Sequence, residues 1–275
     1  MAMFIRTNVA SLEAQRHLSK TQTEQSATFQ RLSSGYRING AADDAAGLGI
    51  SENMNAQVRS YAVAERNAMD GISMAETADG AAGQMHEILG RLRELAVQSS
   101  NGSLQTGDRT NLNTEFTSLR GEIDRISNVT KFNGQSLLSG TAANVDFQVG
   151  IGTSTDDKVS VSFGGVTSTT LGVNASVVDT SANAQSAITA IDSAISTLST
   201  TREGFGSGIN RLQSSVSNIQ SMKTNLAAAH SRIKDVDVAE ESAQLSRQQV
   251  LSQAGVSVLS QANQSPQLAL SLLRG

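Results

Sequence analysis

The chain has 275 residues, with no cysteine, no tryptophan, a single proline and only 3% aromatic residues, so it lacks the bulky side chains that fill most compact cores. Its net charge of −4 is a mixture of both signs, which provides neither a basic face for nucleic acid nor a polybasic segment for an anionic membrane. Without cysteine, disulfides and thiolate metal sites are excluded. Small residues and long helices must carry the packing.

Residues 5–36 form the first predicted element, an amphipathic helix with an interrupted apolar stripe. The apolar positions are Ile5, Val9, Leu12, Phe29, Leu32 and Tyr36. A stripe this thin buries too little surface to offset the cost of ordering the helix by itself. We therefore expect the segment to become ordered only when neighbouring chains cover it. The first residues contain no apolar run of signal-peptide length, so ordinary signal-peptide export is not expected.

Two further helices are predicted, one over about 44–99 and one after a glycine-containing loop at 101–108. Apolar residues such as Leu92 and Leu95 recur at steps of three and four, as on one face of a helix. Asp108 is placed to cap the second of these helices. The first would extend roughly 75 to 80 Å at 1.5 Å per residue.

Helical periodicity stops between residues 139 and 180. Apolar and polar residues alternate there in two short runs, Val145, Phe147 and Val149, then Val159, Val161 and Phe163. The segment between the runs is rich in glycine, serine, threonine and aspartate. This pattern predicts a short β-hairpin.

Residues 181–233 alternate apolar steps of three and four and predict a coiled-coil seam on one long helix. The apolar members of this seam are Ile188, Ile191, Ile195, Leu198, Phe205, Ile209, Leu212, Val216, Ile219 and Leu226. Burying them contributes about 20 to 30 kcal/mol, less than the backbone entropy cost of about 1 to 2 kcal/mol per residue. The helix therefore needs partners, and its match in length to 44–99 predicts a mainly α, elongated antiparallel helical bundle.

The last predicted element, 236–273, is an amphipathic helix with a wider stripe. Its apolar positions include Val250, Leu251, Ala254 and Val258. Pro266 is expected to stop the helix, because proline lacks the N–H that the preceding turn needs. An apolar tail follows with Leu270, Leu272 and Leu273.

Catalysis and metal binding are not expected. His17, His86 and His230 are far apart in sequence, and Gly90 stands where a zinc-protease motif starting at His86 needs its second histidine. Asp43 and Asp44 are too few oxygen ligands for a hard cation, and the favourable field at a helix start explains them better. We expect no cofactor.

Four stretches of the sequence resemble bacterial flagellin. They are LSSGYRINGAADDAAGLGISENM at 32–54, ERNAMDGISMAETADGA at 65–81, LGRLRELAVQSSNG at 89–102 and the string from NLAAAHSRIKDVD to LALSLLRG at 225–275. The resemblance covers about the first 140 and the last 90 residues, in the family's order. By this resemblance, the chain is identified as a short flagellin that lacks the large surface domains of longer relatives.

The resemblance implies two domains. The inner-tube domain (D0) would comprise 1–40 and 234–275. The outer-tube domain (D1) would comprise helices at 41–140 and 181–233, with a β-hairpin and loop at 141–180. The stripes at the two ends, from Ile5 to Leu32 and from Val250 to Leu273, would then be self-assembly surfaces.

The resemblance also implies a function and partners. Flagellins are exported unfolded through the flagellar type III apparatus, with a chaperone, and polymerise beneath a filament cap into a hollow extracellular propeller for motility. The chain would contact other copies of itself and the hook–filament junction proteins. Arg91, Leu95 and Glu115 match positions where recognised flagellins contact Toll-like receptor 5. The simpler interpretation is that Leu95 belongs to the core, while Arg91 and Glu115 form an ion pair between adjacent helices.

Two alternative functions remain open. The chain could be a flagellin-like hook–filament junction protein, although the intact motifs at both ends favour the bulk filament subunit. A cytoplasmic helical signalling module would need an anchor or an adaptor-binding tip that the sequence does not show. The segment TREGFGSG at 201–208 contains three glycines, and each costs about 1 kcal/mol in a helix relative to alanine. Either close packing against a neighbouring element or a flexible point that tunes filament curvature would explain them.

Overall fold

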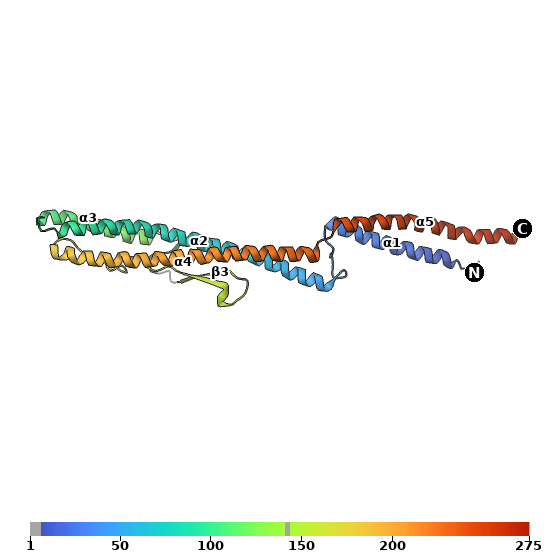
Figure 1. Ribbon diagram of the computed structural model, residues 1–275, viewed down its shortest axis with the longest axis horizontal. Helices are drawn as coiled ribbons and strands as arrows, with labels where there is room; N and C mark the ends of the chain where they lie inside the picture. The colour runs from blue at the N-terminus through green and yellow to red at the C-terminus, as the bar shows by residue number, and fades with distance from the viewer. Residues whose placement is uncertain (1–6, 141–143, 275) are drawn as a thin grey trace. The chain divides into compact units, whose positions relative to one another are not determined.

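The computed structural model describes residues 7–140 and 144–274. Its helices are α1 (Val9–Ser34), α2 (Ala45–Ser100), α3 (Thr106–Val129), α4 (Ser181–Lys234) and α5 (Val238–Arg274) (Figure 1). The antiparallel strand pairs are β1 (Lys131–Phe132) with β2 (Gln135–Ser136) and β3 (Asn144–Gln148) with β4 (Lys158–Ser162), which follows the short 3-10 helix η1 (Thr155–Asp157). The predicted mainly α fold with a small β-hairpin is confirmed.

The chain divides into two compact units. One comprises residues 57–224 and holds most of α2 and α4, all of α3 and the strands. The other is built from both ends of the chain, up to residue 56 and from residue 225, and holds α1 and α5.

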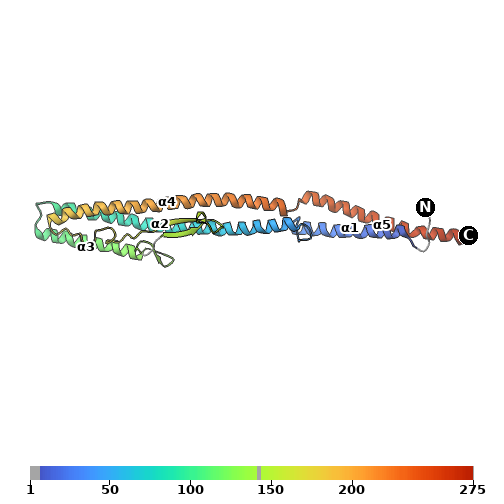
Figure 2. The ribbon, with the colours of Figure 1, turned by 90° about the horizontal axis from the view of Figure 1, so that it is seen from below.

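The core of the 57–224 unit lies between three helices, which run side by side in both ribbon views (Figures 1 and 2). α2 contributes a buried row of alanines and leucines, Ala64, Ala68, Ala75, Ala78, Ala82, Leu89, Leu92 and Leu95. α3 adds Phe116 and Ile123 to the same core. The three- and four-residue spacing in the sequence thus places one face of each helix inside.

The predicted seam of α4 faces this core. Ile191, Leu198, Phe205, Leu212 and Ile219 are buried, and the remaining members are half-buried, Ile188, Ile195, Ile209, Val216 and Leu226. The Phe205 ring lies 5.6 Å from the ring of Phe163, just after β4. The helix is unbroken across the three glycines at 204, 206 and 208.

The β3–β4 hairpin has the predicted strands, with Val145 opposite Val161 and Phe147 opposite Val159. Two glycines allow it to lie against the helices. A Cβ at Gly208 of α4 would be 2.9 Å from Val161 Cγ2, and one at Gly71 of α2 would be 2.9 Å from the Phe147 ring. Close packing therefore explains Gly208, whereas Gly204 and Gly206 face open space.

Polar side chains of α3 fix the long segment before α4. The Asp124 carboxylate accepts hydrogen bonds from the backbone N–H and hydroxyl of Ser168, both at 2.8 Å. Asn113 Oδ1 accepts from Val178 N at 2.9 Å. A segment without regular structure is thereby held against a helix, because its backbone groups have specific partners.

Of two expectations about helix ends, the first holds at a different position and the second is wrong. α3 begins at Thr106, so Asp108 is its third residue, and its carboxylate caps the helix start by accepting from Gln105 N at 3.2 Å as one half of a capping box. α5 continues through Pro266 to Arg274. The carbonyl that Pro266 leaves without a helical partner belongs to Ala262, and Asn8 Nδ2 donates to it at 2.8 Å.

A second strand pair was missing from the sequence prediction. β1 and β2 are joined by Asn133 and Gly134, both with positive φ, 47° and 82°. The Asn-Gly dipeptide is the strongest short-range signal of such a turn. The turn could therefore have been predicted from the sequence, although strands of two residues are too short to show an alternation of apolar and polar residues.

Candidate interaction surfaces

The pair of α1 and α5 has a narrow, largely polar interface. Thr28 is 2% exposed, and Leu18 packs where α5 has Gly255, whose added Cβ would meet Leu18 Cδ1 at 3.3 Å. Ser11 Oγ lies 2.7 Å from Asn263 Oδ1. The pairing half-buries Leu18 and Leu32 of α1 and Leu245 and Leu259 of α5, but it leaves other apolar side chains of both helices exposed.

The exposed apolar side chains of α5 form a stripe along the helix. Val250 is 65% exposed, Leu251 51% and Val258 56%, and the exposed Ala254 lies between them at helical spacing. On α1, Val9, Leu12 and Phe29 are also more than half exposed, while Leu32 is half-buried. Ile5 lies outside the described residues, as do the side chains of Leu270, Leu272 and Leu273.

The two connectors that flank this helix pair are hydrogen-bonded to each other. Arg37 N donates to Lys234 O at 2.7 Å, and Val236 N donates to Gly35 O at 3.0 Å. The Arg37 guanidinium adds a 2.6 Å bond to the carbonyl of Ile233. The links between α1 and α2 and between α4 and α5 therefore form one paired structure.

Asp43 and Asp44 have separate structural roles. Asp44 precedes α2, and its carboxylate accepts from Gly47 N at 2.8 Å, as expected at a helix start. Asp43 accepts from Asn39 N at 3.0 Å and Gly40 N at 3.1 Å. These backbone bonds, and to a smaller extent the Arg31 charge, lower the pKa of the Asp43 carboxyl.

The three residues matched to receptor contacts lie in two environments. Arg91 and Glu115 are about half exposed and joined at 2.9 Å, and Arg91 also contacts Glu94 at 2.9 Å. The hydrogen bonds that Arg91 donates to Glu94 and then Glu115 raise the pKa of its guanidinium. Leu95 is 1% exposed and belongs to the core, so it presents no surface to a partner in this conformation.

Two polar interruptions of the α4 seam are also placed by the structure. Lys223 Nζ lies 2.6 Å from Glu65 Oε2 of α2, so it is a polar-paired side chain. His230 is half-buried, and its Nε2 has no hydrogen-bond partner among the described residues. His230 belongs to no group of three possible metal ligands in the part of the chain that the structure describes.

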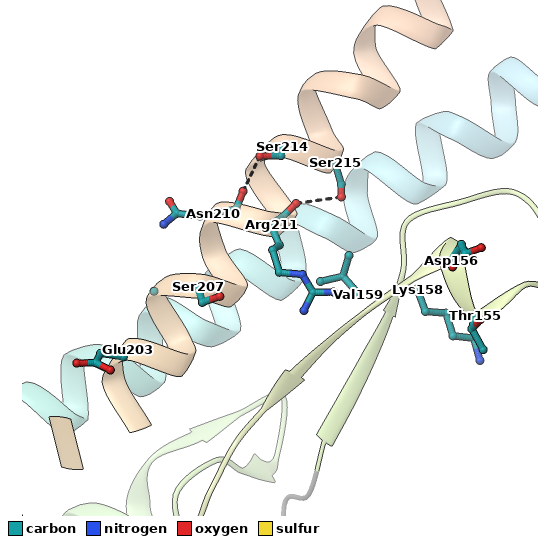
Figure 3. Close-up of a pocket in the computed structure, with 11 residues that line it drawn as sticks. Thr155, Asp156, Lys158, Val159, Glu203, Ser207, Asn210, Arg211, Ser214 and Ser215 are labelled. Carbon is teal, nitrogen blue, oxygen red and sulfur yellow. Dashed lines mark hydrogen bonds between the residues drawn. The ribbon is translucent and has the colours of Figure 1, made fainter. Parts of the chain in front are cut away.

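A groove of about 940 Å³ lies between α4 and the hairpin (Figure 3). Lys158 and Arg211 contribute positive charge to it, and Asp156 and Glu203 contribute negative charge. All four are exposed. A wide trough with both charge signs and no buried polar group has no marked preference for one ligand.

Within the described ranges, no three histidine or carboxylate side chains lie close enough together to hold a metal ion. Over the same residues, each helix is too short or too polar to cross a membrane.

Comparisons with known proteins agree with this arrangement. Residues 5–143 match the model of the bacterial flagellin N-terminal helical region, and residues 188–273 match that of the C-terminal helical region. A flagellin of Halalkalibacterium halodurans is 42% identical over 272 residues, covering 99% of this chain and 100% of that protein.

Solved structures show the same fold. The crystal structure of Bacillus cereus flagellin has 33% identity and a TM-score of 0.51, covering 60% of this chain and 94% of the other. A putative flagellar hook-associated protein from Vibrio parahaemolyticus has a TM-score of 0.59 over 70% of this chain and all of the other, at 16% identity. The chain belongs to the bacterial flagellin family.

Proposed function

We propose that copies of this chain assemble through the apolar stripe of α5 together with the exposed apolar residues of α1. As a flagellin, the chain is a structural subunit of the flagellar filament. The observation that carries the proposal is that Val250, Leu251 and Val258 remain more than half exposed although α5 is paired with α1.

Burial of these side chains supplies the driving force for assembly. A fully buried valine or leucine contributes about 1.5 to 3 kcal/mol, and a contiguous exposed stripe of them marks a protein interface. If the stripe of one copy meets a different surface on the next, the contact is heterologous and does not close, which yields a fibre. The buried area must also offset the cost of ordering the helices.

Charge substitutions on the stripe test this proposal. Val250→Asp with Leu251→Asp should abolish polymerisation of purified monomer seeded by filament fragments, as seen by electron microscopy. Gln249→Asp is the matched control, since Gln249 is also exposed but lies about 100° around the helix from Val250. Filaments of normal yield from the double variant would refute the assembly role of the stripe.

The proposed domain boundaries follow the family pattern, with 1–40 and 234–275 in the inner tube and 41–140, 141–180 and 181–233 in the outer tube. Ordering of the two ends on assembly stays a prediction. Deleting 1–36 or 236–275 should leave a soluble bundle that cannot polymerise. Amide exchange in both ends should slow when monomers enter the filament, and unchanged exchange would contradict coupled ordering.

We further propose that the chain reaches the extracellular filament through the flagellar type III apparatus with an export chaperone, and that it contacts the cap and junction proteins. A hook–filament junction role is the alternative. The similarity to the hook-associated structure supports only a shared fold at its 16% identity. Seeded growth of long filaments from this chain alone would favour the bulk subunit.

Recognition of the monomer by Toll-like receptor 5 is a separate proposal, supported by the exposure of Arg91 and Glu115 on neighbouring helices. Leu95 would then act by holding the shape of α2 from inside the core. Arg91→Ala should weaken activation of a reporter cell line, and Arg125→Ala serves as the control because Arg125 forms an exposed ion pair with Glu122 within α3. A reporter that stays silent to purified monomer would remove the proposal.

A further inference from the structure

Arg31 of α1 lies between two carboxylates that belong to different elements. Its guanidinium is 3.6 Å from Glu241 Oε1 in the first turn of α5 and 3.8 Å from Asp43 Oδ1 in the connector before α2. Neither distance is a hydrogen bond. All three residues belong to the unit formed by the chain ends.

The buried side of this arrangement is incompletely bonded. Glu241 is 5% exposed, and its Oε1 has no hydrogen-bond partner among the described residues. Arg31 Nε is likewise buried without a partner. A buried carboxylate oxygen without a hydrogen bond is costly, so a closer approach of Arg31 to Glu241 Oε1 would be favourable.

Arg31 cannot satisfy both carboxylates as Arg91 does. Arg91 reaches Glu94 and Glu115 at 2.9 Å each because both are exposed side chains free to approach it. Asp43 is instead held by Asn39 N and Gly40 N through its other oxygen, and Glu241 is held by burial. A guanidinium between two fixed carboxylates approaches one by leaving the other.

We propose that Arg31 is a two-position switch that pairs with either Glu241 or Asp43, and so couples the packing of α1 on α5 to the conformation of the 35–44 connector. In one position it ties α1 to the start of α5. In the other it ties α1 to the connector, which is itself hydrogen-bonded to the α4–α5 link through Arg37 and Gly35. The switch is a property of the single chain and does not depend on the assembly surface.

Amide exchange on the full-length monomer tests the switch, read on peptides covering 35–44 and 238–245. Glu241→Gln should release Arg31 to Asp43, which slows exchange of the connector and speeds that of the α5 start, each by about tenfold, the usual effect of a charge-assisted hydrogen bond. Asp43→Asn, which keeps an oxygen for Asn39 and Gly40, should slow the α5 start.

The sign of the effects distinguishes a switch from a static cluster. In a static cluster, either substitution would only loosen both segments or leave the distant one unchanged, and that result would overturn the proposal. Arg31→Gln provides a second test. In the Arg31→Gln background, Glu241→Gln should no longer change amide exchange in the 35–44 connector, and a persisting change would also overturn the proposal.

Discussion

Asn8 Nδ2 donates a 2.8 Å hydrogen bond to the carbonyl of Ala262, four residues before Pro266. Proline has no N–H, so that carbonyl has no partner within α5. Asn8 Oδ1 at the same time accepts from Ser11 N at 3.1 Å and caps α1. One amide side chain thus completes the start of the first helix and the interrupted ladder of the last.

Asn8→Asp separates these two roles, because a carboxylate can still cap α1 but cannot donate to Ala262. We expect it to destabilise the α1–α5 pair by about 0.5 to 1.5 kcal/mol, the usual net contribution of one hydrogen bond, because this bond is only partly buried. Amide exchange in the two helices, or the melting temperature of filaments, would measure the loss. Pro266→Ala restores the missing N–H and should rescue the variant. A double variant as unstable as Asn8→Asp alone would contradict this account.

Gly208→Ala should destabilise the 57–224 unit by about 1 to 3 kcal/mol, because the new methyl group would overpack against Val161. Gly204→Ala and Gly206→Ala are matched controls in the same motif. Both face open space, so each should stabilise the helix by up to about 1 kcal/mol. Urea denaturation would rank the three variants, and equal effects would rule out close packing as the reason for Gly208.

The hypothesis that these glycines tune filament curvature has its own test. Unchanged filament shape in the variant with all three glycines replaced by alanine would refute it.

Glu65 should make the stability of the 57–224 unit depend on pH. Hydrogen bonds from Lys223 at 2.6 Å and then Gln220 at 2.9 Å lower the pKa of the Glu65 carboxyl. A lowered folded-state pKa gives stability that is present above the usual glutamate pKa of about 4.3 and is lost as pH falls through the folded value. Below about pH 5, the free energy of unfolding should therefore fall more steeply with decreasing pH for the natural chain than for Glu65→Gln, as measured by denaturation at each pH. The same pH dependence in both proteins would mean that the hydrogen bonds to Glu65 do not persist in solution.

The ion pairs between α2 and α4 should differ in strength. Arg202 makes two contacts with Asp79, at 2.8 and 3.3 Å, whereas Arg93 makes one with Asp192 at 2.7 Å and is more exposed. We expect Asp79→Asn to cost about 0.5 to 1 kcal/mol and Asp192→Asn less, since solvent screens both pairs. A double-mutant cycle with each arginine would isolate the pair energies. A larger coupling for Arg93 would reverse the ranking.

Local periodicity determined most of the fold. The spacing of apolar residues placed the long helices, the α4 seam and the hairpin within a few residues, because each helix or strand must bury one face. The Asn-Gly turn at 133–134 carried a signal as well, but its strands are too short to show a period. The polar pairing of Lys223 could also be anticipated from its position in a buried row, although its partner Glu65 could not.

Only the tertiary structure shows where contacts between distant residues override the local sequence preferences. Pro266 should end a helix, yet α5 continues because a side chain from the other end of the sequence supplies the missing donor. Gly208 differs from Gly204 and Gly206 only through the strand that packs on it. Arg31 has no local signal that would pair it with Asp43 and Glu241. These relationships join residues far apart in the chain, so the amino-acid pattern around each one cannot contain them.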